Sequence, residues 1–217
     1  MKTYVWILVM LGWMWGATAA EPPVGSTCDA GSSLFDVIFG WESVDSIRME
    51  SFPEIERVRI EAFIRRFKTV QATFVPGKQA FELETRAEKE HRWVSIIWGL
   101  APDSVDVSQV QAFVRAAGML YEWEGMSEGP LSEAQAAESY LKAHDDSPLA
   151  PAIWMFLAHR YRAASECLTH EQQIKAADNT KKNAEKYLNR MTTHSDPLIR
   201  RIGREIGQRP RVYLMPV

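Results

Sequence analysis

Histidine is the side chain best suited to acid–base chemistry near neutral pH, and the chain carries five of them. Glu88 and His91 are separated by two residues, which is half of the motif that di-iron helical bundles use. A di-iron site requires a second such pair, and the sequence has none. We therefore expect His91 to be a partly buried, hydrogen-bonded histidine, and we predict neither a metal nor a cofactor.

His159 is a second candidate proton carrier, because it follows an apolar stretch by one helical turn. A neutral imidazole there could shuttle protons, and the alternative is that the ring only packs in the core. The sequence contains no His-Glu-x-x-His, no Gly-x-Ser-x-Gly and no phosphate-binding Gly-rich loop. Nothing in these patterns favours catalysis over binding.

Several aromatic residues stand beside charged ones, and Trp and Tyr are strong anchors for protein partners. Trp41, Trp93 and Trp123 have charged or polar neighbours, so we expect them to be partly exposed. Tyr121 belongs to the segment YEWEG, whose two glutamates suit a cationic or peptide partner. We predict that these four residues bind a partner; the alternative is that the rings only seal the ends of helices.

Charge is distributed unevenly, although the net charge of the whole chain is only −3. Residues 170–217 contain ten Lys and Arg against five acids and carry +5, so residues 21–169 carry −9. This balance does not favour nucleic-acid binding. The last basic residues flank Leu198, Ile202 and Ile206, which predicts a short basic amphipathic helix. Such a helix could contact an anionic surface or an acidic partner, or it could dock by its apolar stripe within the same chain.

The first twenty residues have the order of a secretory signal. Met1-Lys2 is a positive start, residues 4–16 are uncharged and apolar, and Ala17–Ala20 offers small residues to a signal peptidase. An apolar run of this length is too short to cross ~30 Å of hydrocarbon. We predict a signal peptide over 1–20 and export to the periplasm or the outside, without a lipid anchor. The alternative is an uncleaved N-terminal anchor.

An exported chain meets oxidising conditions, and its two cysteines are Cys28 and Cys167. A bridge between them would close a loop of about 140 residues and contribute ~4–5 kcal/mol through chain entropy. We predict this disulfide. The alternative is two free thiols, with Cys167 buried.

The elements that position these residues are predicted to be helices. Residues 21–34 are rich in Pro, Gly and Ser and indicate an extended lead-in. Beyond it, apolar residues recur at the i, i+3, i+4, i+7 spacing, and no alternating run is long enough for a sheet. We predict an all-α fold of antiparallel helical hairpins, with residues 35–217 as a single helical domain.

Capping signals indicate where three of these helices begin. In a capping box, a Ser or Thr and an acid or amide three residues later bond the free backbone amides of a helix start. This spacing occurs at Ser51 and Glu54, at Ser132 and Gln135, and at Thr169 and Gln172. We expect a helix to begin at each pair.

Two stretches of the second half resemble each other. AESYLK is echoed by AEKYLN at an offset of 47, and SPL is echoed by DPL at an offset of 49. The paired positions are Ala137 and Ala184, Leu141 and Leu188, and Pro148 and Pro197. In each copy a helix with Ala and Leu on its inner face ends, and a Pro opens the next helix. Such self-similarity is typical of stacked helical hairpins.

Trp154, Leu157, Ala158 and Tyr161 lie between the copies, at the spacing of the Trp-Leu-Gly-Tyr pattern in a tetratricopeptide repeat. Residues 120–207 therefore resemble a tetratricopeptide-like hairpin array. The period of 47–49 exceeds that of the family, and Ala158 replaces Gly. The resemblance implies stacked hairpins with a concave surface that binds a protein or peptide; the alternative is an ordinary helical bundle.

Together these patterns predict an exported, non-catalytic helical-repeat module that binds a protein or peptide partner in the cell envelope. One alternative is an exported inhibitor or immunity protein, whose acidic residues 21–169 would complement a basic toxin or hydrolase. Another is an envelope enzyme that uses His91 or His159. An enzyme requires a histidine and a carboxylate in one pocket, whereas a binding module requires aromatic side chains that line a groove.

Overall fold

The computed structural model describes residues 33–40, 42–75, 81–120 and 122–213, and for 81–85 it describes the backbone alone. Every regular element in these ranges is helical, so the predicted all-α fold class is confirmed for them. In chain order the elements are α1 (Leu34–Ile38), the 3-10 turns η1 (Val44–Ser46) and η2 (Met49–Ser51), α2 (Glu54–Gln71), α3 (Phe81–Leu100), α4 (Val107–Ala117), α5 (Glu128–Ala143), α6 (Ala150–His170), α7 (Ile174–Thr192) and α8 (Pro197–Gln208). They belong to one unit of the chain, Gly31–Val217.

Helices α2 and α3 pack through an apolar stripe of α2 that has the helical spacing noted in the sequence. Ile60, Phe63, Phe67 and Val70 recur at helical spacing and are all buried. Gly99 of α3 faces this stripe, since a Cβ atom there would come within 2.7 Å of Phe63 Cδ2. The absence of a side chain at this glycine therefore lets the two helices approach closely.

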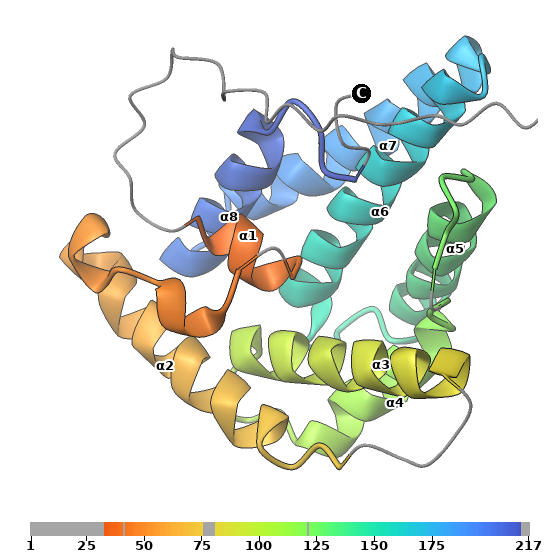
Figure 1. Cartoon of the computed structure of the whole chain (residues 1–217). Coiled ribbons are helices and arrows are strands. Elements are labelled where there is room, and N and C mark those ends of the chain that lie inside the picture. Colours follow the sequence, from red (N-terminus) through yellow and green to blue (C-terminus); the bar gives the residue numbers. More distant parts are fainter. Residues whose placement is uncertain (1–32, 41, 76–80, 121, 214–217) are drawn as a thin grey trace, which may run out of the picture. The chain divides into compact units, whose positions relative to one another are not determined.

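Helix α6 lies in the middle of the described helices and contacts α5, α7 and α8 (Figure 1). Its residues 155–158 have no exposed surface, as expected for a segment that is apolar on nearly all sides. Residues of this helix line both of the hollows described below, because helices pack against it on several sides.

The predicted capping boxes are wrong. Each predicted capping hydroxyl donates to a carbonyl instead of accepting from a free amide: Ser51 bonds Arg48, Ser132 bonds Gly129 and Thr169 bonds Ser165. Ser and Thr hydroxyls in helical turns commonly bond back to a carbonyl three or four residues earlier. A capping box that was not predicted begins α4, where Asp106 and Gln109 cap each other's backbone amides.

Helix α8 is the predicted basic amphipathic helix, and its apolar side is buried within the chain. The buried residues are Leu198, Ile199, Ile202 and Ile206. Arg201 and Arg204 lie 3.7 Å and 3.1 Å from the Glu56 carboxylate of α2. Of the alternatives that the sequence left open, the structure shows docking within the chain, assisted by its acidic portion.

Helix α1 lies beside α8, although more than 150 residues separate them (Figure 1). The Glu205 carboxylate accepts hydrogen bonds from Ser33 Oγ and Phe35 N, both at 2.9 Å. Arg209 also donates to the Asp36 carboxylate. These bonds bring the two ends of the described chain to the same side of α6.

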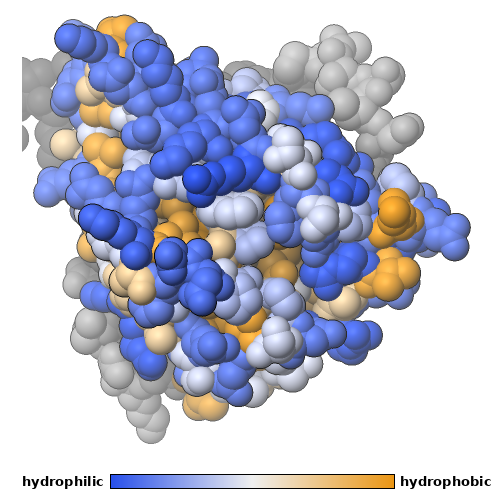
Figure 2. Space-filling view, turned by 180° about the vertical axis from the view of Figure 1, so that it is seen from behind, coloured by the Kyte–Doolittle hydropathy of each residue, from blue (hydrophilic) through white to orange (hydrophobic). Residues whose placement is uncertain are grey.

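Most of the surface seen from the opposite side is hydrophilic, and apolar side chains emerge there only between hydrophilic ones (Figure 2). The most exposed large apolar residues are Val75, Ile55 and Val58, at 82%, 70% and 67% exposure. Within the described ranges, no helix has the length and apolar character needed to span a membrane.

Candidate functional site

A cavity of about 410 Å³ lies between α3, α6, the end of α1, the loop from α4 to α5 and the segment after α8. Its apolar wall consists of Ile38, Phe39, Trp93, Trp123, Val212 and Tyr213. Its polar lining includes Lys89, Arg92, Glu122, His159 and Arg160. Ligand sites are typically clefts of roughly 300–1,000 Å³ with apolar walls and a few converging polar groups. We call this hollow the aromatic cavity.

A tight turn brings Trp123 into the aromatic cavity. Helix α4 ends at Gly118 with a left-handed φ of 60°, and Glu124 and Gly125 also have positive φ values of 50° and 75°. At the start of α5, Gly129 leaves room for the indole, since a Cβ atom there would lie 2.6 Å from Trp123 Cδ1. The position of Trp123 therefore depends on the small residue opposite it.

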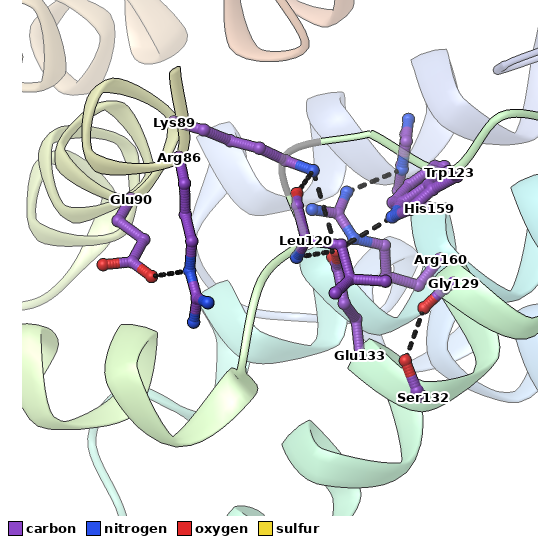
Figure 3. A network of polar contacts seen from close by, with 10 residues as sticks. All are labelled: Arg86, Lys89, Glu90, Leu120, Trp123, Gly129, Ser132, Glu133, His159 and Arg160. Carbon is purple, nitrogen blue, oxygen red and sulfur yellow. Dashed lines mark hydrogen bonds and ion pairs between the residues drawn. The ribbon is translucent and has the colours of Figure 1, made fainter. Parts of the chain in front are cut away.

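The Glu133 carboxylate ties together the polar floor of the cavity (Figure 3). Its side chain is fully buried on α5. Oε1 accepts hydrogen bonds from Trp123 Nε1 at 2.8 Å and from Leu120 N at 3.0 Å, and it lies 3.6 Å from Lys89 Nζ. Oε2 accepts from Arg160 Nε at 2.7 Å. Both oxygens are therefore occupied by groups from three other segments. We call Lys89, Glu133 and Arg160 the buried ion cluster.

Arg160 is an arginine of the most buried helix, with a side chain only 2% exposed. Its guanidinium carbon lies 4.1 Å, 4.6 Å and 4.8 Å from the ring centroids of Phe156, Trp93 and Trp123. Such cation–π contacts are stronger where water is excluded. Its Nη2 is buried and has no hydrogen-bond partner among the described residues.

Burial and charge act in opposite directions on the buried ion cluster. Burial alone would raise the pKa of Glu133, but the charges of Arg160 and Lys89 outweigh it and hold that pKa below its ordinary value. Burial lowers the pKa of Lys89 to about 8, although Glu133 opposes this change. At pH 7 the cluster therefore carries two positive charges and one negative charge.

His159 is a buried histidine that the cluster keeps neutral. Burial and the adjacent Arg160 charge hold its pKa well below the ordinary value, against the opposing effect of the Val212 backbone. Arginine can only donate, so Nδ1 accepts the hydrogen bond from Arg160 Nη1 at 3.0 Å. The ring stacks on Phe39, with centroids 4.0 Å apart. These contacts place His159 as a packing residue of the cavity.

Residues 209–213, which we call the C-terminal strap, form one side of the aromatic cavity. Arg162 of α6 donates to the carbonyls of Ile206 and Arg209. Glu166 accepts from the backbone amides of Val212 and Tyr213, at 2.7 Å and 3.1 Å. Side chains one helical turn apart on α6 therefore hold the strap by its backbone.

The structure describes two of the four predicted partner-binding residues. Trp93 and Trp123 both line the aromatic cavity, but they are 5% and 8% exposed, so the prediction that they are partly exposed is wrong. The glutamates on both sides of Trp123 are exposed and Arg92 bonds the Val37 carbonyl, whereas both indoles turn inward. Trp41 and Tyr121 lie outside the described residues. A binding role for these four remains a prediction.

The histidine and cysteine predictions have different outcomes. His91 is partly buried, and its Nε2 lies 2.9 Å from the Val70 carbonyl oxygen, as expected for a hydrogen-bonded histidine. The part of the chain with described side chains holds no group of three His, Cys, Asp or Glu suited to a metal ion. Cys167 is buried, and burial together with nearby glutamates raises its pKa to about 12. Cys28 lies outside the described residues, so the disulfide remains a prediction.

Most residues of the predicted repeat lie on α5, α6 and α7, and Pro148 lies in the turn before α6. The buried ones are Ala137, Leu157, Ala158, Tyr161 and Ala184, and those at least partly exposed are Leu141, Pro148, Trp154 and Leu188. Pro197 is the first residue of α8. A second hollow of about 340 Å³, the α5–α7 groove, lies between the two copies and is lined by residues that include Glu138, Lys142, Trp154, Lys186 and Arg190.

Sequence reasoning missed Glu133 and Arg160. A signal was present, because Glu133 falls among Pro130, Ala134 and Ala137 on the buried side of α5. Arg160 likewise falls four residues after Phe156 on the most apolar helix. Opposite charges on the apolar sides of two consecutive helices predict a buried pair.

Comparison with known proteins finds no family model, curated protein or solved structure that matches the chain significantly.

Proposed function

We propose that the chain is a non-catalytic module that binds a protein or peptide partner, and that one apolar side chain of the partner enters the aromatic cavity. The observation that carries this proposal is the wall of four aromatic residues around a hollow of about 410 Å³. Aromatic pockets of this kind bind the anchor residues that dominate interface energies.

The state of the polar groups supports binding over proton transfer. His159 is neutral and already bonded to Arg160, and the oxygens of Glu133 are occupied by four donors. A general acid or base must be free to exchange a proton with a substrate. The other candidate histidine, His91, bonds the Val70 carbonyl and is not among the cavity residues.

The cell envelope and the tetratricopeptide-like array are parts of the same proposal. The order of residues 1–20 supports export. The stacking of residues 120–207 as paired hairpins is supported by the contacts between consecutive helices from α4 to α8 and by the proline that begins α8. In such an array the α5–α7 groove would be a second surface for the partner.

Selection of displayed random peptides against the full mature chain tests this function. We expect enrichment of peptides with Phe, Trp, Tyr or Leu at one fixed position. Phe39→Ala enlarges the cavity at a partly exposed residue and should weaken binding of the selected peptides at least about tenfold. Trp154→Ala changes the α5–α7 groove instead. Comparison of the two variants therefore shows which hollow binds the peptides.

Circular dichroism of both variants verifies that they remain folded. Binding that is lost in Trp154→Ala and kept in Phe39→Ala would move the site to the groove. A selection that yields no peptide, or peptides insensitive to both changes, would contradict the proposed function.

A further inference from the structure

One cationic donor of the aromatic cavity has no partner among the described residues. Arginine has five N–H donors, and Arg160 uses Nε on Glu133 and Nη1 on His159. Nη2 is buried and has no partner among the described residues. Aromatic rings lie close to the guanidinium, within 4.8 Å of its carbon. Nη2 is therefore the nitrogen of this guanidinium whose donors remain for an additional ligand.

Lys89 supplies a second donor close to the same cluster. Its Nζ donates to the Leu120 carbonyl and lies 3.6 Å from Glu133 Oε1. An ammonium group has three N–H donors, so these contacts leave one for a ligand. Lys89 and Arg160 both line the aromatic cavity. Two cationic groups are therefore present in the lining of one cavity.

The charges that line the cavity do not cancel. Among the described residues, the lining contributes three positive charges, from Lys89, Arg92 and Arg160, and one negative charge, from Glu122. The buried Glu133, which bonds Arg160 but does not line the cavity, adds a second negative charge and leaves +1. Glu133 has no free oxygen, and Glu122 is exposed. An anion inside the cavity would thus compensate a charge that the protein leaves unbalanced.

We propose that the aromatic cavity binds a carboxylate carried by an aromatic or branched aliphatic group. The carboxylate bonds Lys89 Nζ and Arg160 Nη2, and the apolar group packs against the rings of Phe39 and Tyr213. This inference rests on the proposed function in that the carboxylate belongs to the partner. The same chemistry is available from the C-terminal residue of a peptide, from an acidic side chain beside an aromatic one, or from a free arylalkanoic acid.

Isothermal titration calorimetry of the full mature chain with phenylpropionate and with its uncharged amide tests the carboxylate site. We expect the acid to bind at least about tenfold more tightly, since a carboxylate forms stronger hydrogen bonds to cationic donors than an uncharged amide does. Lys89→Met and Lys89→Gln remove one cation and should abolish most of this preference. Lys181→Met changes an exposed lysine of α7 outside the cavity and should preserve it.

Three peptides identify the source of the carboxylate: Gly-Gly-Phe with a free C-terminus, its C-terminal amide, and acetyl-Asp-Phe-amide. Preference for the first assigns the site to a chain end, and preference for the third assigns it to an acidic side chain. Binding of phenylpropionate without any peptide would support the carboxylate site and contradict the proposed function.

The carboxylate site is overturned if the acid and its amide bind equally, if neither binds, or if the preference survives in both Lys89 variants. Equal binding of the free and amidated peptides in the cavity would likewise overturn it, while the proposed function would stand.

Discussion

The aromatic cavity and the α5–α7 groove are both lined by aromatic and charged residues, but they hold their charges differently. In the cavity, Glu133 is fully buried and Arg160 is 2% exposed. In the groove, Lys142, Lys186 and Arg190 are exposed to solvent. Charges in a poorly hydrated interior interact strongly and depend on each partner, whereas exposed charges are screened.

The two hollows also differ in origin. The groove lies between helices that follow one another closely in the chain, whereas the cavity combines residues from both ends of the described chain. A single change in the cavity should therefore disturb several segments at once. Substitutions in and around the two hollows test that difference.

Glu133→Gln should lower the free energy of unfolding by ~3–5 kcal/mol, because it leaves Arg160 without its buried counter-charge. Urea denaturation followed by circular dichroism measures the loss. Glu138→Gln in the groove is the matched control and should lose about 1 kcal/mol or less. Equal losses at both positions would show that burial of the charges does not distinguish the two hollows.

Gly129→Ala should destabilise the chain by ~1–3 kcal/mol, since the added methyl group would overlap the rigid Trp123 ring. Trp fluorescence should change together with stability, because the indole must move. Gly207→Ala near the end of α8 meets no atom within 4 Å and should be neutral or stabilising. A tolerated Gly129→Ala would mean that the position of Trp123 does not depend on this close contact.

Stability should rise with pH where Lys89 titrates. Its pKa is about 8 in the folded chain, and an unfolded lysine titrates near 10.4, so the unfolded state binds more protons between these values. The contribution is on the order of 1 kcal/mol per pH unit at most. Urea denaturation from about pH 7 to pH 10 should show this rise in the wild type and a smaller one in Lys89→Met. Identical slopes would contradict the buried, charged state of Lys89.

Tyr187→Phe should have the smallest effect, about 1 kcal/mol, because it removes one hydrogen bond of 2.6 Å to the Glu138 carboxylate. The ring remains parallel to Tyr161, with centroids 6.1 Å apart, so packing is preserved. Thermal denaturation monitored by circular dichroism is sufficient. A loss as large as that of Glu133→Gln would place the groove among the strongly coupled parts of the fold.

Much of the helical architecture could be predicted because it depends on local periodicity. The stripe from Ile60 to Val70 and the apolar segment of α6 are buried as expected. The starts of helices were predicted less well, because Ser and Thr hydroxyls can bond a carbonyl behind them as readily as an amide ahead. The backbone conformation before the helix decides which of these two bonds forms.

Local patterns could indicate Glu133 and Arg160 as a buried pair, but not the other groups that form the candidate site. Trp123 has acidic neighbours on both sides, which favours exposure, yet its indole N–H bonds the buried Glu133. Lys89 and Arg160 reach that carboxylate from helices on different sides of it. These contacts join residues that are distant in the chain. The periodicity and residue types of one segment therefore do not show which other segment it contacts.

The C-terminal strap forms one side of the aromatic cavity. This arrangement has a consequence for biosynthesis. Two lining residues of the cavity lie at opposite ends of the described chain: Ile38 is translated near its start, and Tyr213 is its last residue. The hollow therefore closes only after Tyr213 has left the ribosome. Translation products that stop before the strap would contain the residues of α1 to α8 but would lack one side of this cavity.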